Sequence, residues 1–127
     1  MAELALFIWN ILEDGYIEGR ISERFPGMFG EAVKSLRRAM ISMSDSLGDV
    51  KDSSGDGSCL LQGILTYATS GTINYGSLLL TDPVSYLLHD LLDDIDRAVT
   101  SYQASDRAEV VNRILVHGWP LLKIKIE

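Results

Sequence analysis

The chain of 127 residues has little of several features that would assign it to a specialised class. Cys59 is the only cysteine, so no internal disulfide can form and a reducing compartment is compatible. The longest apolar run near the start, residues 4–9, is far too short to cross a bilayer. Glu3 stands where a secretory signal carries basic residues, and no small-residue cleavage site follows. These absences predict a soluble, cytoplasmic protein that does not enter a membrane.

Basic residues are scarce in the middle of the chain. Residues 41–100 hold nine acidic residues against Lys51 and Arg97, a balance of −7 that equals the net charge of the whole chain. The flanking segments almost cancel, since residues 1–40 have a balance of −1 and residues 101–127 a balance of +1. A negative surplus repels nucleic acid backbones and attracts basic proteins. We therefore expect a basic protein partner and no direct binding of nucleic acid.

The remaining composition is that of an ordinary globular protein, with 46% apolar and 23% charged residues. The length fits one domain, over residues 1–127. We predict a mainly α fold, a bundle of about five helices with a short C-terminal β-strand. The alternative is an α+β fold in which the terminal segments form a small antiparallel sheet.

Two helices are predicted in the first third of the chain. Residues 3–14 separate polar from apolar positions as a buried helix does, with Gly15 as its end, although a strand turning at Asp14-Gly15 is the alternative. A second helix follows the breaker Pro26-Gly27. Its apolar positions recur every three or four residues, at Phe29, Ala32, Val33, Leu36, Met40 and Met43. The side predicted to face solvent carries Glu31, Lys34, Arg37 and Arg38.

The centre of the chain is less regular. Residues 44–57 are rich in serine, aspartate and glycine and predict a mobile loop. A third helix is expected over residues 58–69. Residues 69–81 show no pattern that assigns them to a helix or a strand.

Two further helices are predicted in the last third. Asp82 is a suitable N-cap and Pro83 suits a first helical position, and the apolar residues that follow share one arc. A fifth helix opens with Asp106 and Glu109 at capping-box spacing and ends at Gly118 and Pro120. The alternation over residues 122–127 predicts the short strand.

The segment "DSSGDG" partly matches a calcium-binding loop. Asp52, Ser54, Asp56 and Gly57 occupy the first, third, fifth and sixth positions of an EF-hand. The twelfth position, where a bidentate glutamate is required, is Gly63. We therefore predict a turn that binds no calcium.

Cys59 lies in "DGSCLL", with Asp56 placed to cap the following helix, whose dipole would stabilise a thiolate. The segment resembles the Asp-Gly-x-Cys-Leu element of ovarian-tumour-type cysteine proteases. That resemblance implies Cys59 as the nucleophile and His117, in "HGW", as the base. Leu61 and Gln62 replace the aromatic and basic residues that usually follow this element, and the spacing from cysteine to histidine is short. We therefore favour a structural cysteine.

His89 and Asp93, four residues apart, have the spacing of two ligands on one helix face. A zinc site needs more ligands than two, and no second cysteine or histidine lies near them in the sequence. We predict a surface ion pair and no metal or other cofactor.

The fourth predicted helix carries an unusual acidic face. Residues 82–96 hold five aspartates and no base, although solvated faces usually mix signs. Aspartate is also a poorer helix former than glutamate, so this choice does not help the helix to form. We predict a partner-binding site made of Asp82, Asp90, Asp93, Asp94 and Asp96.

In its size, acidity and lack of a catalytic motif, the chain resembles bacterial immunity proteins, such as those of contact-dependent growth inhibition. The resemblance implies a non-enzymatic inhibitor that covers the active site of a basic toxin domain, often a nuclease, and it transfers no residue roles. The alternatives are the cysteine hydrolase, a nucleic-acid mimic that uses the same acidic face, and an adaptor that binds through apolar helices. The sequence does not predict an oligomeric state.

Overall fold

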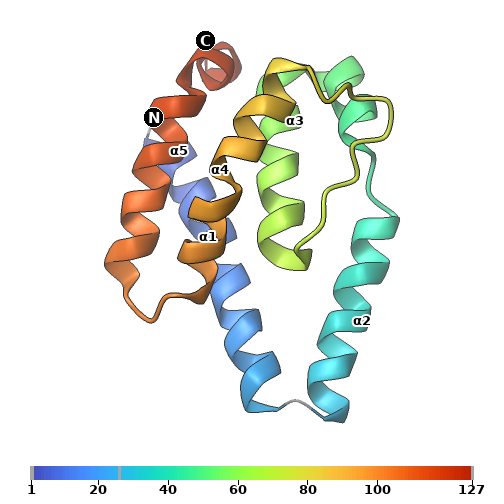
Figure 1. The fold of residues 1–127 in the computed structure, drawn as a ribbon, viewed down its shortest axis with the longest axis vertical. Coiled ribbons are helices and arrows are strands. Elements are labelled where there is room, and N and C mark those ends of the chain that lie inside the picture. Colours follow the sequence, from blue (N-terminus) through green and yellow to red (C-terminus); the bar gives the residue numbers. More distant parts are fainter. Residues whose placement is uncertain (1, 26, 127) are drawn as a thin grey trace.

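A computed structural model describes residues 2–25 and 27–126. Five helices follow one another in the order α1 (Ala2–Arg24), α2 (Met28–Ser42), α3 (Leu47–Ser70), α4 (Pro83–Thr100) and α5 (Ala104–Ile126). Figure 1 shows α1, α3, α4 and α5 gathered into a bundle, with α2 at its side. The mainly α prediction is confirmed. None of the helices in the described ranges combines the length and apolarity needed to cross a membrane.

The core lies among α1, α3, α4 and α5. From α4, the predicted apolar arc is confirmed, because Val84, Leu88, Leu91, Ile95 and Ala98 are buried. Asp82 caps this helix by accepting a hydrogen bond from the Val84 N–H at 2.9 Å, and Pro83 opens it, both as predicted. The other helices contribute Ile8, Leu12, Leu60, Ile64, Val110 and Ile114, all fully buried.

Gly15 does not end the first helix. It is buried in the middle of α1, where a Cβ atom would lie 2.6 Å from the Ala68 carbonyl oxygen and 2.8 Å from Cγ1 of Val99. The glycine therefore allows α1 to cross closely over α3 and α4. The alternative of a strand turning at Asp14-Gly15 is wrong, and tertiary packing decided the role of this glycine.

The second helix forms where it was predicted, but a different side of it faces the protein. Leu36 is 63% exposed, and Ala32 is exposed as well. Arg37, which was expected on the side that faces solvent, is half-buried, and its Nε donates a hydrogen bond to Glu18 of α1 at 2.7 Å. The side chains of Phe29 and Met40, which belong to the same predicted apolar face, lie outside the described part of the structure. Val33, another member of that face, is partly buried, so the described apolar residues mark the packing side of α2 only in part.

Most of the predicted loop over residues 44–57 is helical, which corrects that prediction. Ser46 caps α3, accepting from the Asp49 N–H at 3.3 Å, and Leu47 is buried. The loop between α3 and α4 supports this first turn, because the Leu47 N–H donates to the Asn74 carbonyl at 2.9 Å. Gly55, with φ +89°, kinks the helix at a conformation that other residues rarely adopt. The serine- and glycine-rich composition marks a kinked helix here, not a loop.

The last helix continues past both of its predicted stop signals. Gly118 is buried, where a Cβ would lie 3.1 Å from side-chain carbons of Leu60 and Leu122. Pro120 lies inside α5 and lacks the N–H that would bond one turn back. The predicted C-terminal strand is not seen over residues 122–126, where the helix continues to Ile126 and buries Leu122 against the core; residue 127 of that prediction lies outside the described residues.

A buried arginine joins α5 to α1. The guanidinium of Arg107 lies 4.1 Å from the centre of the Tyr16 ring, donates to Glu13 at 2.7 Å and donates to the Ser101 carbonyl at 2.8 Å. These partners satisfy a charge that would be costly to bury alone. The contact holds the start of α5 against α1, and no sequence pattern predicted it.

We expect the Gly15→Ala substitution to destabilise the protein by about 1–3 kcal/mol, because the added methyl group overlaps backbone atoms that cannot rotate away. The gain in helix propensity, about 0.5–1 kcal/mol, is smaller than this cost. Gly19→Ala is the matched control, since its Cβ would meet only the Val99 carbonyl oxygen, at 3.9 Å, and it should stabilise the protein slightly. Urea denaturation measures both; equal stability of the two variants would contradict the close crossing.

Candidate functional site

The outer face of α4 is a continuous exposed stripe. Tyr86, His89, Asp90, Asp93 and Asp96 are all exposed, at spacings of three or four residues that place them along one side of the helix. The opposite side is buried in the core. We call these five residues the α4 stripe. Because the core face fixes the rotation of the helix, the stripe has a defined orientation.

The aspartates of the stripe are mostly without internal partners. Asp90 and Asp93 form no hydrogen bond or ion pair with any described residue. Asp96 accepts a hydrogen bond from the Tyr67 hydroxyl at 3.0 Å. Burial and this hydrogen bond both raise the pKa of Tyr67. Asp90 and Asp93 are therefore the carboxylates most available to a partner.

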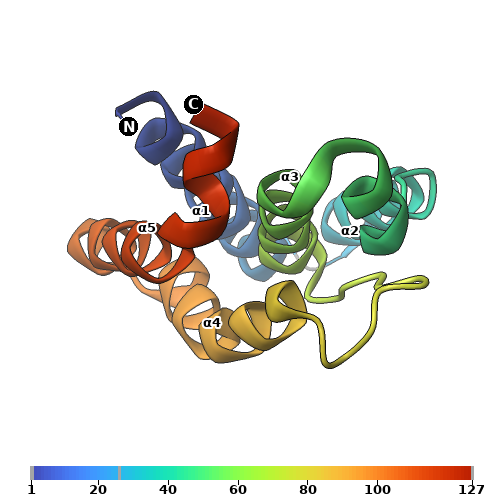
Figure 2. The ribbon, with the colours of Figure 1, turned by 90° about the horizontal axis from the view of Figure 1, so that it is seen from above.

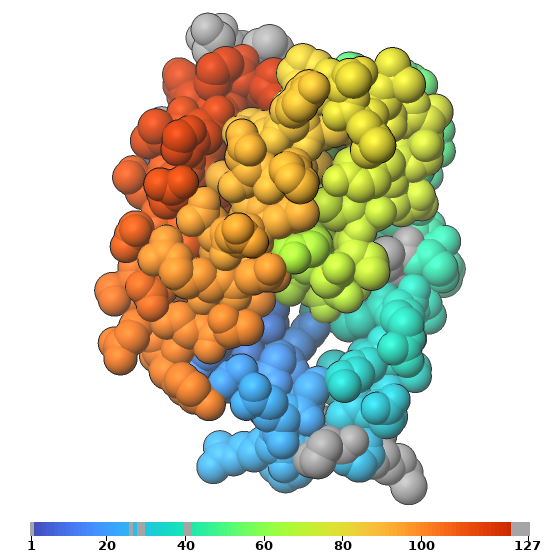
Figure 3. Space-filling view, viewed as in Figure 1, coloured from blue at the N-terminus to red at the C-terminus, as the bar shows by residue number. Residues whose placement is uncertain are grey.

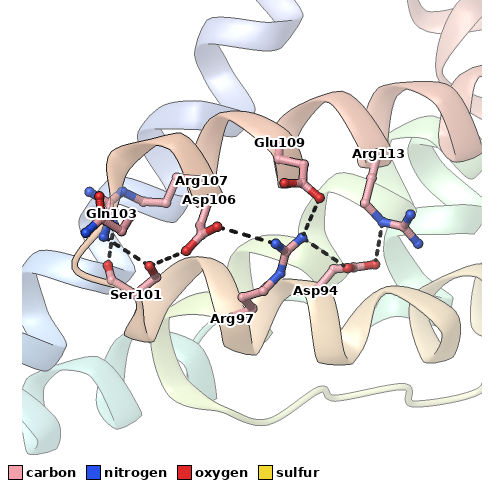
Figure 4. Close-up of polar contacts among 8 residues, drawn as sticks. All are labelled: Asp94, Arg97, Ser101, Gln103, Asp106, Arg107, Glu109 and Arg113. Carbon is pink, nitrogen blue, oxygen red and sulfur yellow. Dashed lines mark hydrogen bonds and ion pairs between the residues drawn. The ribbon is translucent and has the colours of Figure 1, made fainter.

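Asp94 instead belongs to an ion-pair network that joins α4 to α5 (Figure 4). It accepts from Arg113 Nε at 3.0 Å and lies 3.7 Å from Arg97 Nη2. Arg97 also reaches Asp106 and Glu109 of α5, at 3.5 and 3.3 Å. Arg97, the only arginine or lysine of α4, is thus turned towards α5 and away from the stripe, whose one basic side chain is His89.

Asp106 takes part in this network rather than in the predicted capping box. It also accepts a hydrogen bond from the Ser101 hydroxyl, at the end of α4. Glu109 bonds Arg97 across the helix pair. The helix begins at Ala104, so Asp106 lies in its first turn and is not the cap that the spacing predicted.

Asp82 likewise has an internal role. Besides capping α4 it pairs with Lys51 of α3, which also lies 3.6 Å from Asp56. Burial acts to raise the pKa of Asp82, but the hydrogen bonds from Lys51 and the Val84 N–H outweigh it and lower the pKa. The structure therefore divides the five predicted site residues: Asp90, Asp93 and Asp96 share the stripe, whereas Asp82 and Asp94 hold helices together.

Exposed apolar residues, which the sequence reasoning missed, lie beside the N-terminal end of the stripe. Leu80 is 74% exposed and Leu79 is nearly as exposed, just before α4. Tyr86 is 61% exposed in the first turns of the helix. The Ser85 hydroxyl donates to the Leu79 carbonyl at 2.8 Å, which holds this loop against the helix. The run of three leucines at 78–80 was the available signal, but only Leu78 of the three is buried.

Cys59 is not placed as a nucleophile. Its side chain is fully buried in the core, and its thiol donates to the Leu47 carbonyl at 3.4 Å. Burial, with the nearby charges of Asp82 and Asp56, raises the pKa of the thiol to about 11. His117 is exposed on α5 and forms no hydrogen bond with Cys59. The structure therefore does not bring the two residues of the hydrolase hypothesis into a reactive pair.

Neither sequence hint of a metal site has support in the described ranges. The residues that matched a calcium loop, 52–57, lie inside the kinked α3, and no group of three or more candidate ligands occurs among the described residues. His89 and Asp93 are both exposed, and the ion pair expected between them is not formed. Both belong to the α4 stripe.

A second candidate site is a cleft of about 730 Å³ between the α1–α2 hairpin and the ends of α3 and α4. The space-filling view shows the molecule hollowed between the lower parts of α1 and α2, below α3 (Figure 3). Four basic residues line it: Arg20, Lys34, Arg37 and Arg38. Asp96 also lines this cleft, so one end of the stripe borders it.

We expect the Cys59 thiol to react slowly in the folded protein. With a pKa of about 11, only about one thiol in ten thousand is ionised at pH 7, and the sulfur is also inaccessible. Labelling with a thiol reagent should be slow in buffer and fast in urea, and Cys59→Ala should retain the biological effect. Rapid labelling of the native protein at pH 7 would contradict the buried position.

No protein-family model, no curated protein and no solved structure matches this chain. The resemblances to immunity proteins and to ovarian-tumour-type proteases thus have no support from a family, a relative or a structural neighbour.

Proposed function

We propose that this chain is a non-enzymatic binding protein that neutralises a basic protein partner, in the manner of a bacterial immunity protein. The partner would be a toxin domain, possibly a nuclease, whose cationic active-site cleft is covered by the α4 stripe. The protein would act in the cytoplasm and need no cofactor.

The main support is the uncompensated charge of the α4 stripe. Asp90 and Asp93 have no partner among the described residues, and Arg97, the only arginine or lysine of the helix, is held by α5. Asp96 keeps an exposed carboxylate beside them. Carboxylates of one sign on a rigid helix attract a basic surface and accelerate its capture. A nuclease active site binds phosphates and therefore presents such a surface.

The apolar residues at the end of the stripe support the same proposal. Protein interfaces combine a buried apolar or aromatic centre with a polar rim, and tyrosine is enriched among the residues that dominate binding. Leu80 and Tyr86 would supply this centre, and Asp90 and Asp93 the adjacent charged rim. Charge would then set the rate of association, and the apolar contact would slow dissociation.

We expect Asp90→Asn with Asp93→Asn to slow association with the partner captured from the protein's own cells. The association rate of the parent should fall as salt rises from 0.01 to 0.1 M, because the Debye length shortens from about 30 to about 10 Å. The double variant should associate more slowly at low salt and lose most of this salt dependence. Surface plasmon resonance measures both rates.

Asp45→Asn with Asp52→Asn is the matched control. Both residues are exposed and lie before or within the first part of α3, and the change in net charge is the same. If binding depends on the stripe, the control should keep at least about half of the parental rate. Equal slowing in both double variants would reduce the effect to overall charge, and no slowing in either would contradict the proposed site.

A further inference from the structure

The cleft between the α1–α2 hairpin and the ends of α3 and α4 has the dimensions of a small-molecule site. Its volume of about 730 Å³ falls within the range of about 300–1,000 Å³ that is usual for ligand pockets. Gly15, Gly19, Ala68 and Val99 contribute small and apolar surface, and polar side chains surround it. The cleft is therefore large enough to take a compact organic molecule.

Two of the three acidic residues of the cleft are paired with bases. Glu18 accepts from Arg37, and Glu23 accepts from Arg20 at 2.9 Å. Asp96 accepts from the neutral Tyr67 hydroxyl at 3.0 Å and keeps its charge. The two glutamates therefore do not neutralise Lys34 and Arg38, which share the cleft with the single charge of Asp96.

Two cations of the cleft remain available. Lys34 and Arg38, one helical turn apart on α2, form no ion pair with any described residue. Arg38 makes only a long hydrogen bond, of 3.5 Å, to Ser35. Arg20 also lines the cleft, but it is engaged elsewhere: it pairs with Glu23, and its guanidinium lies 4.7 Å from the centre of the Tyr102 ring and 5.4 Å from that of Tyr16.

Both cations lie at the edge of the cleft. On α2 the cleft is lined by Val33, Lys34, Arg37 and Arg38; Val33 and Arg37 are partly buried, whereas Lys34 and Arg38 are exposed. A bound anion would compensate these two exposed cations.

We propose that this cleft binds a small phosphate-bearing molecule. A phosphate monoester carries a charge of about −1.5 to −2 at pH 7 and offers several strong acceptor oxygens, which matches two unpaired cations. The hydroxyl of Ser22, which bonds no described residue, is a further donor in the lining. The inference is independent of the proposed function, since it rests on α1 and α2 rather than on Asp90 and Asp93.

Nuclear magnetic resonance titration of the ¹⁵N-labelled full chain tests the proposal with four probes: pyrophosphate, adenosine 5′-monophosphate, adenosine and citrate. Pyrophosphate and the monophosphate should give saturable shifts of the amides of cleft residues such as Gly19, Lys34, Ser70 and Thr72. Adenosine, which lacks the phosphate, should give none. Citrate, a polyanion without phosphorus, should bind more weakly.

Lys34→Gln and Arg38→Gln should each weaken binding of pyrophosphate at least about tenfold, the usual effect of losing a charged hydrogen bond. Arg24→Gln is the matched control, because Arg24 is an exposed cation outside the cleft and its loss should change affinity less than about twofold. Circular dichroism checks that each variant remains folded. The Asp90→Asn, Asp93→Asn variant should bind pyrophosphate as the parent does, which separates this site from the α4 stripe.

Three results would overturn the proposal. One is the absence of saturable shifts with millimolar pyrophosphate or monophosphate at low salt. Another is binding that Lys34→Gln and Arg38→Gln leave unchanged. The third is citrate binding as tightly as pyrophosphate, which would show a cleft that accepts any polyanion.

Discussion

The crossing of α1 over α3 and α4 at Gly15 is the constraint on which the rest of the structure depends. A side chain at this position would overlap the Ala68 backbone, so the three helices can meet only because the residue is a glycine. Since α1 continues as a helix to Arg24, the hairpin it forms with α2 extends past the end of α3, as Figure 1 shows. The cleft opens in the space this creates. Seen from above, α2 lies beside α3, on the side away from α5 (Figure 2). The same crossing packs Val99 of α4 inwards and directs the opposite side of that helix to solvent.

Internal ion pairs sort the charged side chains into structural and available ones. Asp94 of α4 pairs with Arg113 of α5, and Arg97 of α4 pairs with Glu109 of α5. Lys51 of α3 pairs with Asp82. Exposed pairs of this kind contribute only about 0–1 kcal/mol each, so they orient the helices more than they stabilise the fold. The available charges then occupy two separate places, carboxylates on the α4 stripe and cations on α2. The overall charge of −7 describes neither surface.

Local sequence determines some helices of this chain, whereas distant contacts determine others. In α4 the cap, the proline and the apolar arc all favour one helix with one buried side, and the structure agrees. The glycines were misread, because the sequence distinguishes poorly between a glycine that ends a helix and one that admits a neighbouring helix. Gly15 and Gly118 both have the second role. The start of α3 was read as a loop, because its stability comes from Leu47 and from hydrogen bonds to residues 74 and 75, far along the chain.

The sequence by itself determined the mainly helical class, the concentration of negative charge in residues 41–100 and the exposed side of α4. These features follow from local periodicity and composition, which need no knowledge of neighbours. Tertiary structure alone decided which aspartates remain unpaired, the burial of Cys59, the rotation of α2 and the existence of the cleft. Each of these depends on residues distant in sequence, such as Arg113 for Asp94 and Glu18 for Arg37, whose approach is set by helix packing and not by spacing along the chain.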